Sequence, residues 1–216
     1  MMMEESDAKR RKVEEGQTPA KDEDVAMKEE PAEAPKEQEV DQKPDKRAQL
    51  GQEVQFESRD ATLNVIPTVG GRVLMPLTDG GLQYLIAGAR ANVGVSKGRY
   101  LFEVKIVEAL NPTEPPTPHG GASTPTPMPR QLVRIGFSTK DSSLFLGETQ
   151  DSLCFDSEGF FTADKKRSAT SQRFSRDQII GVMVNLDRKS PNADTVSLFR
   201  DGVRVSQPQP IPEFLQ

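Results

Sequence analysis

Side chains that bind metals or act as catalytic bases are scarce in this chain of 216 residues. It contains one histidine, His119, and one cysteine, Cys154, which lie far apart in the sequence. Structural zinc sites need several clustered cysteines and histidines. Ser-His-Asp and Cys-His catalysis both need a histidine base on a rigid element, and His119 lies in a stretch rich in proline and glycine. We therefore expect no metal site, no cofactor and no catalysis of these kinds.

Carboxylates could still pair as a catalytic acid and base, and four of them lie close together: Glu148, Asp151, Asp156 and Glu158. Such a pair needs a pocket, which the sequence does not reveal, whereas acidic residues are common in turns between strands. We therefore favour ordinary turn residues over an active site. Cys154 lies in an apolar stretch, so we expect a buried, unreactive thiol. A single cysteine also excludes an internal disulfide, which fits a reducing compartment.

The N-terminal part of the chain differs in composition from the rest. Residues 1–50 contain no aromatic residue and carry ten Lys and Arg against fifteen Asp and Glu. Such a segment cannot bury enough apolar surface to offset the entropy of an ordered chain, so we expect a disordered acidic tail. Residues 51–216 carry eighteen residues of each sign, so the net charge of −5 arises in the tail. RNA remains a candidate partner, but the charge of the folded part gives it no support.

One cluster within the tail is basic, because Lys9, Arg10, Arg11 and Lys12 follow one another. The cluster resembles a monopartite nuclear localisation signal, whose cationic side chains reach an acidic groove of an import receptor. The alternative is a chance cluster in a charge-rich stretch. We predict an import receptor as a partner and the nucleus as the location. No window approaches the roughly 18 apolar residues of a membrane-spanning helix, so we expect no membrane association.

The remainder of the chain must position any binding residues, and its pattern is that of antiparallel β-structure. Apolar and polar residues alternate in short stretches separated by turn residues, and no long helix is indicated. The alternation is clearest in three stretches, and three shorter strands are expected as well. The three clear stretches are Tyr100–Val107, Leu132–Ser138 and Ile179–Leu186, and the shorter ones are Leu63–Ile66, Val73–Met75 and Leu82–Ile86.

Two further features favour a sandwich of two antiparallel sheets. Ile179 and Met183 make the second face of their stretch partly apolar, which indicates a central strand. Val196–Val205 is expected to be a hairpin, because Asp201 and Gly202 both accept the positive φ angles of a tight turn. Several short antiparallel strands without crossover helices predict an all-β, two-sheet β-sandwich.

Asn111–Arg130 interrupts this pattern with seven prolines in twenty residues. Proline removes backbone donors that a β-ladder uses, so we predict a solvent-exposed loop insertion. Three of its threonines precede proline and are candidates for proline-directed phosphorylation, against the alternative of a plain low-complexity insertion. These are Thr117, Thr124 and Thr126.

Several blocks of the sequence resemble the motifs of SPRY domains. Gly88–Ile106, which contains the turn Gly-Val-Ser-Lys-Gly, resembles the opening motif of the family. The later blocks follow in the order of the family. They are Val133–Ser138, Leu146–Glu148, Phe155–Gly159, Asp177–Asp187 and Val196–Gly202. Within the superfamily, the blocks are most similar to the SPRY domain of heterogeneous nuclear ribonucleoprotein U-like proteins. The next nearest is the SPRY subunit of histone lysine methyltransferase complexes.

The resemblance implies that residues 51–216 form a SPRY-like sandwich that binds proteins through its loops and performs no catalysis. Phe137 stands where the family usually has tryptophan, and Asp201 where asparagine is common. The SAP, kinase-like and RNA-binding RGG-rich parts of the ribonucleoprotein family have no counterpart in this sequence. The chain also ends where SPRY domains usually continue with a closing segment. Either closing strands are missing, as in a truncated product with an unpaired strand edge, or Val54–Phe56 covers the gap.

The resemblance places the partner-binding residues in loops at one end of the sandwich. The candidates are Arg90, Asn92, Asp141, Glu148 and Asp151. The alternative for each of them is a solvated turn residue. We expect a non-catalytic nuclear adaptor in ribonucleoprotein or RNA-processing assemblies. The alternatives are a chromatin adaptor that resembles the methyltransferase subunit and binds an acidic or phosphorylated partner near Arg90, and a direct RNA-binding protein.

Overall fold

The computed structural model describes residues 35–40, 53–109 and 132–215. The predicted import cluster and the three predicted phosphorylation sites lie outside these residues. Within the described ranges the chain forms strands and two single-turn 3-10 helices. No helix in this part of the chain is long and apolar enough to cross a membrane.

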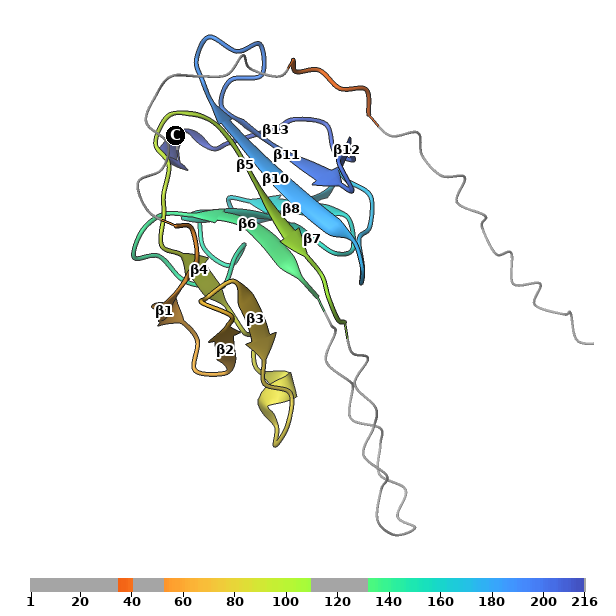
Figure 1. Cartoon of the computed structure of the whole chain (residues 1–216). Helices are drawn as coiled ribbons and strands as arrows, with labels where there is room; N and C mark the ends of the chain where they lie inside the picture. The colour runs from red at the N-terminus through yellow and green to blue at the C-terminus, as the bar shows by residue number, and fades with distance from the viewer. Residues whose placement is uncertain (1–34, 41–52, 110–131, 216) are drawn as a thin grey trace, which may run out of the picture. The chain divides into compact units, whose positions relative to one another are not determined.

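Most strands belong to two antiparallel sheets. The strands of the first sheet are β5 (Gly98–Lys105), β10 (Ile179–Leu186), β11 (Thr195–Arg200), β12 (Val203–Arg204) and β13 (Gln209–Pro210). The strands of the second sheet are β6 (Arg134–Ser138), β7 (Ser152–Asp156), β8 (Phe160–Ala163) and β9 (Lys166–Ala169). The first sheet has the order β12-β11-β10-β5, with β13 also paired to β11, and the second has the order β6-β7-β8-β9. Figure 1 shows the two sheets as two layers, so the predicted all-β sandwich is confirmed.

The central strand β10 has the bounds that the sequence predicted, and it separates two different environments. It pairs with β11 on one side and with β5 on the other. Its residues Ile180, Val182 and Val184 are buried in the core. Because successive side chains of a strand point to opposite faces, Met183 and Asn185 lie on the outer face of the sheet. The outer face of β10 therefore carries a buried polar residue, Asn185, beside the apolar Met183.

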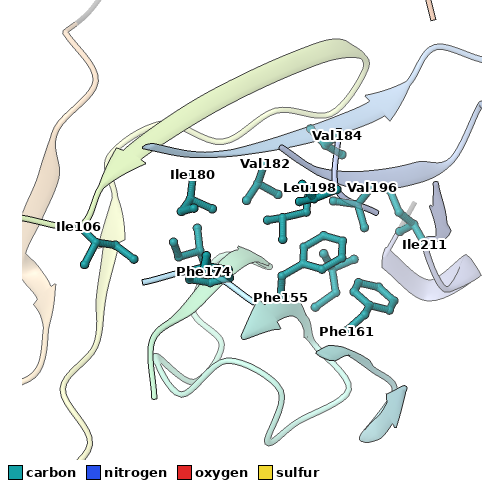
Figure 2. Close-up of a cluster of buried hydrophobic side chains, with 13 residues drawn as sticks. Ile106, Phe155, Phe161, Phe174, Ile180, Val182, Val184, Val196, Leu198 and Ile211 are labelled. Atoms are coloured by element: carbon teal, nitrogen blue, oxygen red, sulfur yellow. The ribbon is translucent and has the colours of Figure 1, made fainter. Parts of the chain in front are cut away.

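The core lies between the two layers and is rich in aromatic side chains. Phe155 of β7 and Phe161 of β8 pack with their ring centroids 5.0 Å apart. Figure 2 shows these rings facing the aliphatic side chains of β10 and β11. Phe102 of β5 and Phe137 of β6 meet edge to face, with centroids 5.3 Å apart. The phenylalanine that replaces the usual tryptophan thus still makes an aromatic contact between the sheets.

The turn between β11 and β12 confirms the predicted hairpin. Asp201 and Gly202 have φ angles of 52° and 81°. The Oδ1 atom of Asp201 also accepts a hydrogen bond of 2.9 Å from the backbone N–H of Ile179. The aspartate in this turn therefore connects the hairpin to the first residue of β10.

The outer edge of β11 has backbone partners at both of its ends. β12 pairs with its C-terminal end and β13 with its N-terminal end. Between them, the backbone N–H of Leu198 donates to Oγ of Ser206 at 2.8 Å. The carbonyl oxygen of Leu198 accepts a bond of 2.9 Å from the N–H of Val205. Backbone and side-chain partners therefore follow this edge of β11 from its N-terminal to its C-terminal end.

Two small sheets complete the described part of the fold. β1 (Phe56–Ala61) pairs with β4 (Ala89–Ala91), and β2 (Val65–Thr68) pairs with β3 (Val73–Pro76). Figure 1 shows these four strands beside the sandwich. The stretch around Val54–Phe56 leads into β1, where Phe56 pairs with Ala91 of β4.

One predicted strand, Leu82–Ile86, is not a strand. Leu82–Tyr84 forms the 3-10 helix η1, and the backbone N–H of Leu85 donates to the carbonyl oxygen of Leu82 at 3.0 Å. Gly80 and Gly81, which precede it, have φ angles of 62° and 94°. Two consecutive residues in the left-handed region turn the chain out of an extended path. The second 3-10 helix is η2 (Glu213–Leu215).

Candidate functional site

Arg90, the first predicted partner-binding residue, lies in β4 and fixes a loop of the domain. Its Nη1 atom lies 2.7 Å from Oδ2 of Asp60 in β1. Its Nε donates to Oγ of Ser138 at 3.1 Å, and its Nη2 donates to the carbonyl oxygen of Ser142 at 2.7 Å. The side chain is 16% exposed. All three guanidinium nitrogens therefore have acceptors within the chain, and together they join the loop after β6 to the sheet of β1 and β4.

Asn92 makes a similar connection to the residues before β1. Its Nδ2 donates to the carbonyl oxygen of Glu53 at 3.0 Å, and its Oδ1 accepts a bond of 3.0 Å from the backbone N–H of Gln55. The geometry thus gives Arg90 and Asn92 positioning roles in the domain. A direct role of either in partner binding stays a prediction.

The other three candidates, Asp141, Glu148 and Asp151, are exposed in the loop between β6 and β7. Arg90 contacts this loop at the residue after Asp141, so the structure brings Arg90 and Asp141 near one another. The carbonyl oxygen of Asp151 accepts a bond of 3.0 Å from the N–H of Thr139, which closes the base of the loop. Partner binding by these carboxylates also stays a prediction.

Asp156 has a structural role in the turn between β7 and β8. Its side chain is 2% exposed. Oδ1 accepts bonds of 3.0 and 3.1 Å from the backbone N–H groups of Glu158 and Phe160. Oδ2 accepts bonds of 3.0 and 2.7 Å from Nε and Nη2 of Arg167.

In the described ranges, no group of three or more His, Cys, Asp or Glu side chains could hold a metal ion.

Cys154 lies in β7, two residues before Asp156, and is fully buried. Burial raises the pKa of the Cys154 thiol to about 11, because the thiolate would lose its hydration. The thiolate is the nucleophilic form of cysteine, so this thiol is a poor nucleophile at neutral pH. The prediction of a buried thiol is confirmed.

An acidic side chain binds the outer face of the first sheet at Arg204 of β12. The side chain of Arg204 is 1% exposed. Its Nε and Nη2 atoms donate to the two carboxylate oxygens of Glu37 at 3.1 and 2.8 Å. The guanidinium also lies over the ring of Phe199, its cross-strand neighbour, with Cζ 4.8 Å from the ring centroid. Such paired, charge-assisted bonds are strong and fix the orientation of the carboxylate.

A second carboxylate, that of Glu39, binds β5 and β10 of the same sheet. Oε2 of Glu39 lies 2.5 Å from Nη1 of Arg99 in β5 and 3.4 Å from Nδ2 of Asn185 in β10. Arg99 and Asn185 are cross-strand partners. Nη2 of Arg99 also donates to the carbonyl oxygen of Val40 at 2.8 Å. We call Arg99, Asn185 and Arg204 the glutamate-binding surface, and residues 35–40 the docked segment.

The electrostatics of the glutamate-binding surface favour anions. The hydrogen bonds from Arg204 hold the pKa of Glu37 below its ordinary value, against an opposing effect of burial. The backbone N–H groups of Glu39 and Gln38 lower this pKa further. None of the three residues of the surface is a nucleophile or an ordinary catalytic base, so the chemistry that the arrangement supports is reversible binding of carboxylates.

The docked segment is a feature that sequence reasoning missed. It lies within residues 1–50, where the composition predicted a disordered tail, and its residues Glu37 and Glu39 contact the domain. The segment has no aromatic residue and no apolar alternation. Its partners lie 60 and 167 positions away, at Arg99 and Arg204, so no local pattern announces them. The feature of the sequence that corresponds to the docking is the spacing of Glu37 and Glu39, which are two residues apart.

Comparison with known proteins gives partial matches. No protein-family model matches the chain. Heterogeneous nuclear ribonucleoprotein U-like protein 2 of mouse and of human are each 30% identical to this chain over 103 residues. The chain resembles part of a nuclear ribonucleoprotein. The match covers 48% of this chain and 12% of each relative, so the chain spans about an eighth of the length of these curated relatives. The similarity to U-like proteins that the motifs predicted is confirmed.

Among solved structures, the chain is similar to the crystal structure of the SPRY domain of human HERC1. The TM-score is 0.49 at 18% sequence identity, and the match covers 74% of this chain and 82% of that chain.

Proposed function

We propose that the chain is a non-catalytic nuclear protein-interaction module that acts as an adaptor in ribonucleoprotein or RNA-processing assemblies. The observation that supports this most directly is the docked segment. Side chains of β5, β10 and β12 hold a short acidic stretch of polypeptide on the surface of a rigid sheet. A preformed surface of this kind suits recognition of a protein segment, because little reorganisation is needed on binding.

The nuclear and ribonucleoprotein parts of the proposal are supported by similarity and by the tail. The curated relatives are named as heterogeneous nuclear ribonucleoprotein U-like proteins. The basic cluster of residues 9–12 resembles a signal for an import receptor. The exposed loop between β6 and β7, with Asp141, Glu148 and Asp151, is a second proposed contact for a protein partner.

A pull-down from nuclear extract with the full chain tests the adaptor role. We expect ribonucleoproteins to be retained, and to remain after treatment with ribonuclease, because an adaptor of this kind contacts protein. Recovery of histone methyltransferase subunits in their place would support a chromatin adaptor. Loss of all bound proteins on ribonuclease treatment would contradict the proposal and favour direct RNA binding.

Microscopy of the tagged full chain in cells tests the location. We expect the intact chain in the nucleus and reduced nuclear signal when Lys9, Arg10, Arg11 and Lys12 are all replaced by glutamine. A matched control replaces Lys21, Lys28, Lys43 and Lys46, which removes the same charge elsewhere in the tail and leaves the docked segment intact. An intact chain excluded from the nucleus would contradict the proposal.

A further inference from the structure

We propose that the glutamate-binding surface is a binding site for a Glu-x-Glu segment of a partner protein, and that the docked segment occupies this site in cis as a competitor. This inference rests on the proposed function of the chain as a protein-interaction module. It adds the chemistry of the recognised segment and a means of regulating access to it.

The spacing of the two carboxylates defines the recognised pattern. Residues i and i+2 of an extended chain lie on the same side, roughly 6.5 Å apart. Glu37 and Glu39 both contact the sheet, whereas the side chain of Gln38 between them donates to Oε1 of Gln207 at 2.9 Å. The first carboxylate binds β12 and the second binds β5 and β10, so the segment runs across the strands. A single acidic residue could satisfy only one of the two guanidinium groups.

Arg204 shows that the surface is made for an anion. With the docked segment in place, its guanidinium is covered and Glu37 contacts it. A cation covered by polypeptide is costly without a counter-ion, so a segment that covers Arg204 is favoured when it supplies a carboxylate. Among the described residues, Nη1 of Arg204 and Oγ of Ser197 are buried and have no hydrogen-bond partner. Both residues lie on the outer face of the sheet, so the floor of the site has hydrogen-bonding capacity that the docked segment leaves unused.

Positive charge continues beyond Arg99. A shallow hollow next to it is lined by Ser96, Lys97, Gly98, Leu186, Asp187, Arg188 and Lys189. The lining has three cationic side chains and one acidic one. This distribution favours an acidic protein segment over a basic or apolar one.

The docked segment can be displaced, because it uses few apolar contacts. Val40 is 86% exposed, and Leu101, two residues after Arg99 on the same face of β5, is 54% exposed. Buried anchors supply most of the affinity of protein interfaces, and this segment has a charged one, the side chain of Glu39, which is 4% exposed. A partner with the same two carboxylates and an apolar residue over Leu101 would bind more tightly. Tethering in cis supplies an effective concentration on the order of millimolar, which sets the threshold for displacement.

Fluorescence anisotropy with a labelled peptide of residues 34–41 tests the proposal on the full chain. The wild-type chain is compared with the variant Glu37→Gln/Glu39→Gln, called the emptied chain, which removes both carboxylates from the glutamate-binding surface and leaves the sequence of the sandwich unchanged. We expect the variant to bind the peptide at least about tenfold more tightly than the wild type, because the tethered competitor is lost. Adding Arg99→Gln to this variant should remove the gain.

Two controls separate the site from a general charge effect. The variant Glu29→Gln/Glu30→Gln makes the same change in the net charge of the tail and should behave as the wild type. A peptide with glutamine in place of both glutamates should bind the emptied chain at least about tenfold more weakly. This second comparison needs no substitution in the domain, so it holds even if Arg99→Gln impairs folding.

Equal affinity of the emptied and wild-type chains for the peptide would overturn the proposal, and so would equal binding of the glutamine peptide. The assay uses purified components, so its outcome is independent of the nuclear pull-down. Failure of the peptide assay with ribonucleoproteins still retained would leave the adaptor role intact. Success of the peptide assay without ribonucleoproteins would contradict the adaptor role and leave the binding site in place.

Discussion

Arg167 of β9 donates two hydrogen bonds to one carboxylate oxygen of Asp156, at 2.7 and 3.0 Å, while the other oxygen accepts two backbone N–H groups of the turn after β7. Asp156 thus connects three successive strands of the second sheet through one side chain. Asp156 was one of the four acidic residues considered as a catalytic pair, and these contacts give it a role in the stability of the domain.

Replacement of Asp156 by asparagine should destabilise the domain. The change places an amide NH2 group where a carboxylate oxygen now accepts bonds, so Arg167 or the turn loses its acceptor. We expect a loss of about 2 kcal/mol in the free energy of unfolding. Urea unfolding followed by circular dichroism measures it. Asp151→Asn, at an exposed position, is the control and should change stability by less than about 0.5 kcal/mol. Equal effects of the two substitutions would contradict this role.

Cys154 should resist thiol reagents in the folded protein. Burial raises the pKa of its thiol to about 11, so little thiolate exists at neutral pH. Because the fold disfavours the thiolate of Cys154, the thiol becomes reactive only when the domain unfolds or opens locally. Titration with a chromogenic disulfide at about pH 8 should show almost no reaction in buffer and one reacting thiol per chain in denaturant. Reaction in buffer at the rate of a free cysteine would contradict the buried environment.

Gly136→Ala should prevent correct pairing of β6 and β7. A Cβ atom at this position would lie 2.0 Å from the carbonyl oxygen of Leu153 and 2.6 Å from Cα of Cys154, and backbone atoms cannot move aside as a flexible side chain can. We expect a loss of roughly 3 kcal/mol or an insoluble product. Gly94→Ala is the matched control, because nothing lies within 4 Å of its Cβ position. Thermal unfolding of both variants compares them, and a stable Gly136→Ala domain would refute the expectation.

Docking of the acidic segment should depend on pH through Glu37. The docked state holds the pKa of Glu37 below its ordinary value, mainly because Arg204 donates hydrogen bonds to it, helped by the N–H groups of Glu39 and Gln38. The stabilisation is therefore fully present above the ordinary pKa and is lost as the pH falls through the lowered pKa. The difference in melting temperature between the wild type and Glu37→Gln should thus shrink from about pH 7 towards about pH 3. A difference that grows on acidification would contradict the sign.

The sequence predicted the central parts of the fold because their signals are local. The bounds of β10 followed from its alternation, and the hairpin followed from Asp201 and Gly202, whose types suit a left-handed turn. Leu82–Ile86 was mistaken for a strand because its apolar content hid the effect of two preceding glycines. Local patterns thus identify strands better than they identify the short helices that connect them.

The candidate site was predicted less well, for a physical reason. The loop residues around Arg90 were found through their motif, but their contacts depend on Asp60 and Ser142, which lie far from Arg90 in sequence. The glutamate-binding surface depends on pairs separated by 60 and 167 positions. Arg204 belongs to a two-residue strand and reads as an ordinary surface cation until the burial of its side chain is known.

The pairing of β11 with both β12 and β13 bears on how the domain could associate with copies of itself. Fibril growth and strand exchange proceed by adding a chain to open backbone donors and acceptors of a sheet. The two short strands, with Ser206 between them, occupy those groups along β11. Of the two marginal strands of this sheet, β12 has two residues and β5 has eight, so among the described strands β5 offers a further chain the longer edge.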